Sequence, residues 1–309
     1  MRIAIMGPGG VGGYFGGLLA RAGEDVVFIA RGQHLEAIVK NGLKILSPKG
    51  DFLVKASGTD DPSKINPVDL ILFSVKGFDT IEAAEKIKPI VLKDTMVISL
   101  QNGVEKEEIL GRILGDNHIL GGLCTLSAHI EAPGIIKHEG LERLVFGEID
   151  GRKTDRGKLI LEVFQNAGIN AILSENVIAE EWEKFAFICA IGGLCSLTRL
   201  PVGPILHFEK TRQLYSNIMA EIIEIAQHKG VSFDDDDVLQ KLMNFSLGLN
   251  PEIRPSMYRD VINGRRMEID ILNGAVVRLG RELKVPTPTN DFIFACLDVI
   301  NNVNLGTKT

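Results

Sequence analysis

Residues 2–13 read Arg-Ile-Ala-Ile-Met-Gly-Pro-Gly-Gly-Val-Gly-Gly, an apolar run that leads directly into a cluster of glycines. The apolar run predicts a buried strand over residues 2–6, and the apolar spacing after the glycines predicts a helix. The pattern G-x-G-x-x-G over residues 7–12 therefore lies between a strand and a helix. In that position it is typical of the first βαβ unit of a Rossmann fold.

The three motif glycines have separate roles in such a fold. Gly7 permits the tight turn, Gly9 lets a pyrophosphate approach the backbone, and Gly12 lets the helix pack closely on the strand. The phosphates then lie at the positive N-terminus of the helix. We predict that the loop contacting the cofactor consists of Gly7, Pro8, Gly9, Gly10, Val11 and Gly12.

The end of the next predicted strand, Asp25–Ala30, indicates which dinucleotide is bound. An NAD site usually carries Asp or Glu there, about 20 residues beyond the glycines, to bind the ribose 2′-hydroxyl. This chain has Arg31 instead. Because a guanidinium matches a 2′-phosphate in charge and fork geometry, we predict NADPH/NADP+ as the cofactor. The alternative is a solvated arginine after an edge strand.

Outward from this stretch, β-branched runs alternate with helical patterns, which predicts βαβ units and a mainly parallel sheet over residues 1–174. Further expected strands are Val68–Val75, Thr95–Leu100 and Ile119–Leu126. A meander-like set is then expected at Gly134–His138, Arg143–Glu148 and Asn170–Leu173, with one helix around Arg156–Ala167.

After Ser174 nearly every segment has helical periodicity, with proline, glycine and asparagine between the segments. We therefore expect two domains: residues 1–174, an NADP-binding Rossmann domain, and residues 175–309, a helical substrate and catalytic domain. The fold class is α/β, with a doubly wound, mainly parallel sheet followed by an all-helical C-terminal domain. The acidic run Asp234–Asp237 precedes an apolar run, which favours a helix N-terminus over a metal site.

Composition excludes several classes of protein. The net charge is −6 and 24% of the 309 residues are charged, so no basic stripe is present to follow a nucleic acid. The chain starts directly with a strand-like run, without the features of a signal peptide. The longest nearly uncharged stretch, Phe185–Leu197, is shorter than the roughly 20 residues that cross a bilayer. We therefore expect no membrane segment. The four cysteines form no CxxC pair, which favours a reduced compartment, so we expect a cytoplasmic protein.

Two polar residues follow later strands of the expected sheet. Lys76 ends the run Ser74-Val75-Lys76, and Asn102 follows Leu100-Gln101. Ligands of doubly wound sheets lie beyond the carboxyl ends of the strands, so both residues are candidates to face the nicotinamide or the substrate. The alternatives are a solvated lysine and an Asn-Gly turn.

The helical half contains a second group of candidates. Lys184 precedes a long apolar helix, and a partly desolvated lysine with a carboxylate partner can act as a proton donor. Ser256, Asp260 and Glu268 lie around predicted helix starts, where spacing alone favours capping and dipole matching as their roles.

In these motifs the chain resembles the ketopantoate reductase family, the 2-dehydropantoate 2-reductases of pantothenate (coenzyme A precursor) biosynthesis, over essentially its whole length. The shared motifs occur in the family's order and are GPGGVGG, Arg31, SVK with Lys76, LQNG with Asn102, WEK with Lys184, and SMYRDVINGRRMEID over residues 256–270.

The resemblance implies a role for each matching position. Lys184 would be the general acid to the ketone oxygen, Glu268 would hold that lysine and contact the substrate, and Ser256 would bind the substrate carboxylate. Lys76 and Asn102 would lie near the nicotinamide and the substrate, and Asp260 would have a supporting role. The reaction would be NADPH-dependent reduction of a small 2-oxo acid, with no metal ion. The apolar helical half is compatible with a homodimer.

One departure from the family puts the substrate in question. Many members carry asparagines four and eight residues after the lysine, where this chain has Ile188 and Gly192. Each lost hydrogen-bond partner costs about 1 kcal/mol. The loop at 198–203 is a candidate for compensating contacts. The alternatives are therefore a reductase of a different 2-oxo acid or of an imine, and a non-catalytic NADPH-binding sensor.

Overall fold

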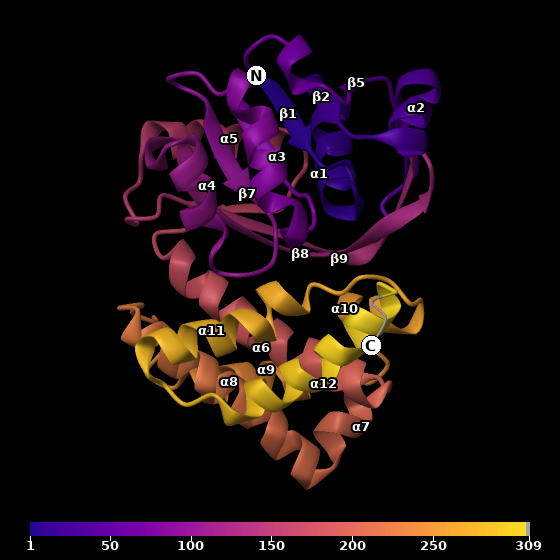
Figure 1. Cartoon of the computed structure of the whole chain (residues 1–309). Helices are drawn as coiled ribbons and strands as arrows, with labels where there is room; N and C mark the ends of the chain where they lie inside the picture. Colours follow the sequence, from indigo (N-terminus) through magenta and orange to yellow (C-terminus); the bar gives the residue numbers. More distant parts are fainter. Residues whose placement is uncertain (307–309) are drawn as a thin grey trace. The chain divides into compact units, whose positions relative to one another are not determined.

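A computed structural model describes residues 1–306 of the chain. Contacts divide the chain into two compact units. The first unit comprises residues 1–101 and 105–177, and the second comprises residues 102–104 together with the chain from Ile178 onward. Figure 1 draws the first unit mostly in indigo to magenta and the second mostly in orange to yellow.

The first unit is built on a ten-stranded sheet with the order β4-β3-β9-β8-β7-β6-β1-β2-β5, and β10 pairs with β9. From β5 to β8 along this order every neighbouring pair is parallel. The doubly wound, mainly parallel sheet expected from the sequence is thereby confirmed. The strands are β1 Arg2–Met6, β2 Asp25–Ile29, β3 Leu43–Leu46, β4 Phe52–Val54, β5 Ser57–Thr59, β6 Leu70–Phe73, β7 Met96–Ser99, β8 Ile119–Ala132, β9 Ile135–Gly147 and β10 Ala171–Leu173.

Helices cover both faces of this sheet. Alternate side chains of a strand point to opposite faces, so one strand contributes to two buried clusters. Ile3 and Ile5 pack into the buried cluster that includes α1 and α5. Ala4 and Met6 pack into the cluster that includes α3 and α4. The helices of this unit are α1 Gly10–Arg21, α2 Gly32–Asn41, α3 Thr80–Ile87, α4 Lys106–Leu114 and α5 Asp155–Asn166.

The two strands expected at residues 134–138 and 143–148 form one continuous strand, β9, antiparallel to β8. The register passes from Leu126 opposite Glu142 to Ser127 opposite Gly140, so that Leu141 bulges out with a φ of 51°. The bulge absorbs the extra residue without ending the ladder. Figure 1 shows β8 and β9 side by side as a long two-stranded ribbon. The sequence pattern also missed β3, β4 and β5, which are three or four residues long.

The described residues of the second unit contain helices and no strand, as the sequence predicts. Its helices are α6 Val177–Thr198, α7 Val202–His207, α8 Glu209–His228, α9 Val238–Leu247, α10 Ser256–Ile262, α11 Asn273–Leu283 and α12 Pro288–Asn304. Asp237 is the N-cap of α9 and accepts a hydrogen bond from the Gln240 N–H at 3.0 Å, which confirms the expected helix start. Within residues 1–306 no helix is long and apolar enough to cross a membrane.

A buried amide network joins four helices of the second unit. Asn273 donates to the Asn290 Oδ1 at 2.9 Å and, more weakly, to the Cys189 carbonyl in α6 at 3.4 Å. Asn290 in turn donates to Glu221 at 2.7 Å. Glu221 also accepts the backbone N–H groups of Thr289 and Asn290, which compensates the N-terminal dipole of α12. Polar groups with these fixed partners allow one packing arrangement of α6, α8, α11 and α12.

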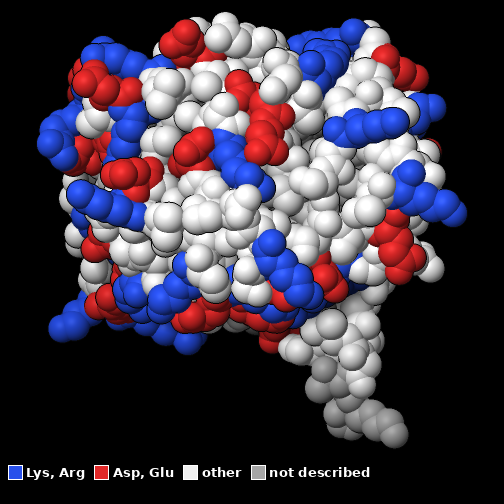
Figure 2. All heavy atoms as spheres, turned by 90° about the horizontal axis from the view of Figure 1, so that it is seen from above, with Lys and Arg blue, Asp and Glu red and all other residues white. Residues whose placement is uncertain are grey.

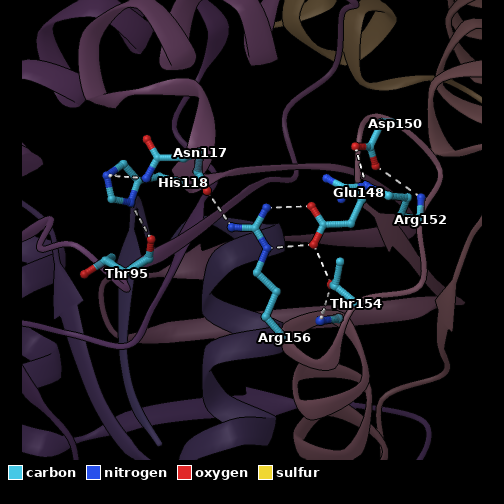
Figure 3. Close-up of polar contacts among 9 residues, drawn as sticks. Thr95, Asn117, His118, Glu148, Asp150, Arg152, Thr154 and Arg156 are labelled. Atoms are coloured by element: carbon cyan, nitrogen blue, oxygen red, sulfur yellow. Dashed lines mark hydrogen bonds and ion pairs between the residues drawn. The ribbon is translucent and has the colours of Figure 1, made fainter.

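A second polar cluster, drawn in Figure 3, fastens the end of β9 to the start of α5. Glu148 is 6% exposed and accepts hydrogen bonds from the Arg156 Nε at 2.7 Å and Nη2 at 2.5 Å. Thr154 donates to the same carboxylate, and Arg156 also donates to the Asn117 carbonyl. The hydrogen-bonded Arg156 guanidinium lowers the pKa of Glu148 below its ordinary value of 4.5.

On the face drawn in Figure 2, basic and acidic side chains are interspersed with neutral ones.

Replacing Arg156 tests this cluster. We expect Arg156→Ala to lower the free energy of unfolding by about 1–3 kcal/mol, because the buried Glu148 carboxylate loses its charged donor. The pKa of Glu148 is depressed in the folded state, so this stabilisation is present above pH 4.5 and is lost as the pH falls through the folded pKa. Urea unfolding at pH 7 and pH 3.5 measures both effects.

The matched control is Arg152→Ala, which removes an exposed arginine paired with the exposed Asp150. Such a pair contributes roughly 0–1 kcal/mol. Equal losses in the two variants would contradict the role assigned to the Glu148 cluster.

Candidate active site

The glycine loop after β1 is shaped by close backbone approaches. Gly7 has a φ of +86°, which favours glycine, and a Cβ there would lie 2.9 Å from the Val75 nitrogen. A Cβ at Gly12 would lie 2.6 Å from the Gly7 carbonyl oxygen and closer still to Ser74 Oγ. Ser74, in turn, donates to the Gly7 carbonyl at 2.9 Å. The loop, the first turn of α1 and the end of β6 are therefore packed together without room for another carbon.

Gly9 differs from its neighbours because a Cβ there would meet nothing of this chain within 4 Å. It is the N-cap of α1, whose first turn has no acidic residue. A Cβ at Gly10, by contrast, would lie 2.2 Å from the Ala128 carbonyl oxygen in β8 and would collide with it. The Gly9 side of the loop therefore offers open space at a positive helix N-terminus, as an anionic ligand requires.

His34 holds this loop in place, and the sequence analysis did not single it out. Its Nδ1 accepts the Gly134 N–H at 3.1 Å, so its Nε2 carries the proton and donates to the Pro8 carbonyl at 2.8 Å. Burial lowers the pKa of His34 from 6.5, and the Pro8 hydrogen bond opposes that shift. Both partners are distant in sequence, at separations of 26 and 100 residues, so no local pattern indicates them.

Arg31 and Lys76 flank the glycine loop on neighbouring strands. Arg31 follows β2 as the N-cap of α2, and Lys76 follows β6 as the N-cap of a short 3₁₀ helix, Gly77–Asp79. Since β2 and β6 both pair in parallel with β1, all three segments lie at the same sheet edge. The Arg31 side chain is 78% exposed, and its Nη2 is 3.6 Å from Asp79 Oδ2. An exposed pair of this length is weak, so the guanidinium can bind an anion at little cost.

Gln101, which no local pattern indicated, links the residue before Lys76 to the start of α3. It is 5% exposed and donates to the Val75 carbonyl at 3.0 Å and to Thr80 Oγ1 at 2.8 Å. A buried glutamine with two such partners is held in one orientation.

In the second unit, Asn102 and Glu268 lie on segments that pack together. A Cβ at Gly103, next to Asn102, would lie 3.3 Å from the Ile271 carbonyl oxygen. Glu268 is the N-cap of a single 3₁₀ turn, Ile269–Ile271, where a helix start was expected near residue 266; α11 begins only at Asn273. Glu268 as a whole residue is 8% exposed, a burial that is rare for an acid and more frequent at functional sites.

The segment before Glu268 is anchored from α12. Asn301 Oδ1 accepts the Met267 N–H at 2.8 Å, and the Glu268 carbonyl accepts the Ile271 N–H at 3.2 Å. These backbone bonds fix the main chain on both sides of the carboxylate.

Lys184 lies in α6, one turn after Glu180 and Glu181. Ser256 is the first residue of α10, after the N-cap Pro255, so its hydroxyl does not occupy the N-cap position. The next residue, Met257, lies against α6, with its Cε 3.2 Å from where a Cβ of Gly192 would be. Asp260 is one turn further along α10 and is half-buried. The second unit therefore brings the start of the Ser256 helix onto the helix that carries Lys184.

The loop at residues 198–203 was a candidate for compensating polar contacts. Its first residue, Thr198, donates its hydroxyl to the Leu194 carbonyl at 2.7 Å within α6. No group of three or more His, Cys, Asp or Glu side chains in residues 1–306 is arranged to hold a metal ion.

An open glycine loop at the edge of a doubly wound sheet, followed by a helical unit with a lysine and a buried carboxylate, defines an oxidoreductase with a Rossmann-like NAD(P)-binding fold. Residues 3–151 match the family described as ketopantoate reductase PanE/ApbA, and residues 176–301 match its C-terminal family. The chain belongs to the ketopantoate reductase PanE/ApbA family, which confirms the resemblance drawn from its motifs.

Individual similar proteins include ketopantoate reductases and a dehydrogenase of another 2-hydroxy acid. A 2-dehydropantoate 2-reductase from Pyrococcus abyssi is 33% identical over 94% of each chain. The PanE/ApbA family ketopantoate reductase structure from Ralstonia eutropha has a TM-score of 0.91 and 35% identity, covering 99% of this chain and 100% of that one. A ternary structure of D-mandelate dehydrogenase with NADH and anilino(oxo)acetate has a TM-score of 0.90 and 26% identity, covering 99% of each chain.

The glycine loop yields a pair of opposed predictions. Gly12→Ala should destabilise the protein by roughly 1–3 kcal/mol or more, because its Cβ overlaps the Gly7 carbonyl. Gly9→Ala should fold with nearly unchanged stability and bind NADPH at least tenfold more weakly, since its methyl group occupies the open side of the loop. Thermal unfolding and NADPH titration distinguish the two. Tight NADPH binding by Gly9→Ala would contradict the assignment of this loop.

Proposed function

We propose that this chain is an NADPH-dependent reductase of 2-oxo acids of the 2-dehydropantoate 2-reductase type, which would convert ketopantoate or a close analogue to the 2-hydroxy acid. The family matches over residues 3–151 and 176–301 support this proposal most directly. Within the second unit, Met257 of the Ser256 helix lies against Gly192, two turns beyond Lys184 on α6. A proton donor and a carboxylate-binding hydroxyl are the two protein groups that reduction of a 2-oxo acid requires.

The cofactor would be held by the first unit. Gly7, Gly9 and Gly12 shape the loop, the N-terminus of α1 would face the pyrophosphate, and Arg31 would bind the 2′-phosphate. His34 and Gln101 would act as positioning residues for the loop and for the segment around Lys76. NADPH supplies the hydride when it is bound.

Lys184 would protonate the oxygen of the substrate carbonyl as the C2–O double bond becomes a single bond. Its positive charge would also stabilise the negative charge that develops on this oxygen. Glu268 would hold the lysine and contact the substrate, and Ser256 would donate to the substrate carboxylate. Asn102 and Lys76 would orient the reacting groups, and Asp260 would support the Ser256 helix.

Lys184→Ala tests the reaction. We expect turnover of 2-oxo acids with NADPH to fall roughly 10²–10⁴-fold, while the Kd for NADPH changes less than threefold. NADPH absorbance during turnover and fluorescence titration measure the two quantities. The matched control is Lys241→Ala, which removes the exposed partner of Glu183 and should leave both values unchanged. Near-normal turnover by Lys184→Ala would exclude this lysine as the acid, and NADPH binding without any turnover by the wild type would favour a sensor.

Arg31→Ala tests the choice of cofactor. We expect its Kd for NADPH to rise about 10–100-fold, the effect of losing hydrogen bonds to a charged group, while its Kd for NADH stays within a factor of three. The companion variant Asp79→Asn frees the Arg31 guanidinium and should bind NADPH at least as tightly as the wild type. A parallel loss for both nucleotides in Arg31→Ala would show that Arg31 does not recognise the 2′-phosphate.

A further inference from the structure

One buried side chain ties the helix of Lys184 to the segment of Glu268. Asn273 is the first residue of α11, five residues after Glu268, and it is fully buried. Its Nδ2 donates to the Cys189 carbonyl in α6 at 3.4 Å, five residues after Lys184. The same nitrogen lies 3.4 Å from where a Cβ of Gly193 would be, so the amide rests on the backbone of α6. Five residues of helix span only about 7.5 Å along the axis.

Asn273 is itself held from its other side. Each hydrogen of its amide nitrogen has a partner, one the Cys189 carbonyl and the other Asn290 Oδ1 at 2.9 Å. Asn290 is fully buried and donates in turn to Glu221 in α8. An amide with both hydrogens bound has one orientation. The side chain therefore fixes the start of α11 against α6.

The oxygen of the same amide argues for a role beyond stability. Asn273 Oδ1 is buried and has no hydrogen-bond partner among residues 1–306. Leaving a buried polar atom without a partner lowers the stability of the fold, and an apolar side chain of similar shape avoids that cost. An asparagine at this position therefore favours a defined placement of α6 over the greatest stability of the core.

We propose that Asn273 is a positioning residue for the reaction, which sets the placement of the Lys184 amine relative to the Glu268 carboxylate. This inference rests on the proposed function, because it concerns the acid and the carboxylate of that reaction. A neighbouring carboxylate raises the pKa of a lysine. Without the Asn273 amide, the lysine would be both less well aligned with the carbonyl oxygen and less stabilised in its protonated form.

The other carboxylates along α6 do not depend on this amide. Glu180 and Glu181 lie one turn before Lys184, and Glu183 is paired with a lysine of α9 at 2.8 Å. Since all three are on the lysine's own helix, a shift of α6 carries them along with it. Their effect on the lysine therefore stays the same when Asn273 is replaced.

Asn273→Leu tests the proposal, because leucine resembles asparagine in shape and has no amide. With saturating NADPH and a 2-oxo acid that the wild type reduces, we expect kcat/KM for the acid to fall roughly 10–100-fold. The basic limb of its pH profile should move to lower pH by about half a pH unit or more, because protonated Lys184 loses stabilisation. The Kd for NADPH should stay within threefold. If Asn273→Leu does not fold, Asn273→Ser, which adds no bulk, carries the same prediction.

The matched control is Ser246→Ala, which removes a fully buried hydroxyl from another part of the same core. That hydroxyl lies 3.2 Å from the Tyr215 hydroxyl and donates to the Leu242 carbonyl at 2.7 Å. We expect its loss to lower thermal stability and to leave kcat/KM and the pH profile unchanged. An unmoved profile in a folded Asn273 variant, or an equal shift in Ser246→Ala, would overturn the positioning role and leave the proposed function intact. A wild type that reduces no 2-oxo acid would refute both.

Discussion

Gly12 lies so close to the Gly7 carbonyl and to Ser74 that α1 rests directly on the loop at the end of β1, and this close packing is the constraint on which the first unit depends. It sets the direction of α1 and thereby aims the helix N-terminus along the sheet edge. Because β2 and β6 are parallel neighbours of β1, the same edge receives Arg31 and Lys76. The Gly12 approach and the parallel pairing of β1 together determine where a dinucleotide would lie and which charges would meet it.

In the second unit, α6 has a structural role and, in the proposed reaction, a chemical one. Its apolar residues, such as Phe185 and Cys189, are buried in the helical core, and the amide network through Asn273 holds the helix against α11 and α12. Lys184 is thereby carried on a rigid element. The segment around Glu268 is fixed independently through Asn301. Rigid placement would suit the proposed role of Lys184 as a proton donor, because a general acid must be held within reach of the group it protonates.

The strands β1, β2, β6, β7 and β8 and the helical half were predictable from the sequence because their signals are local. The run at residues 2–6, the glycine motif and the periodicity of α5 each specify their own element. The continuous β9 was not predictable, because the Leu141 bulge depends on pairing with β8. The same reason applies to the site. Arg31 and Lys76 follow strands and could be placed at the sheet edge, whereas the contacts of His34 and of Met257 join segments far apart in the chain.

The proposed reaction transfers a hydride to a 2-oxo acid, and isotopic labelling tests that step most directly. The wild-type protein is incubated with NADPH deuterated at both C4 positions and with a panel of 2-oxo acids that includes trimethylpyruvate and ketopantoate, and the products are analysed by mass spectrometry. The account predicts a 2-hydroxy acid that carries one deuterium at C2. A product without deuterium, or no product although NADPH is bound, would contradict it.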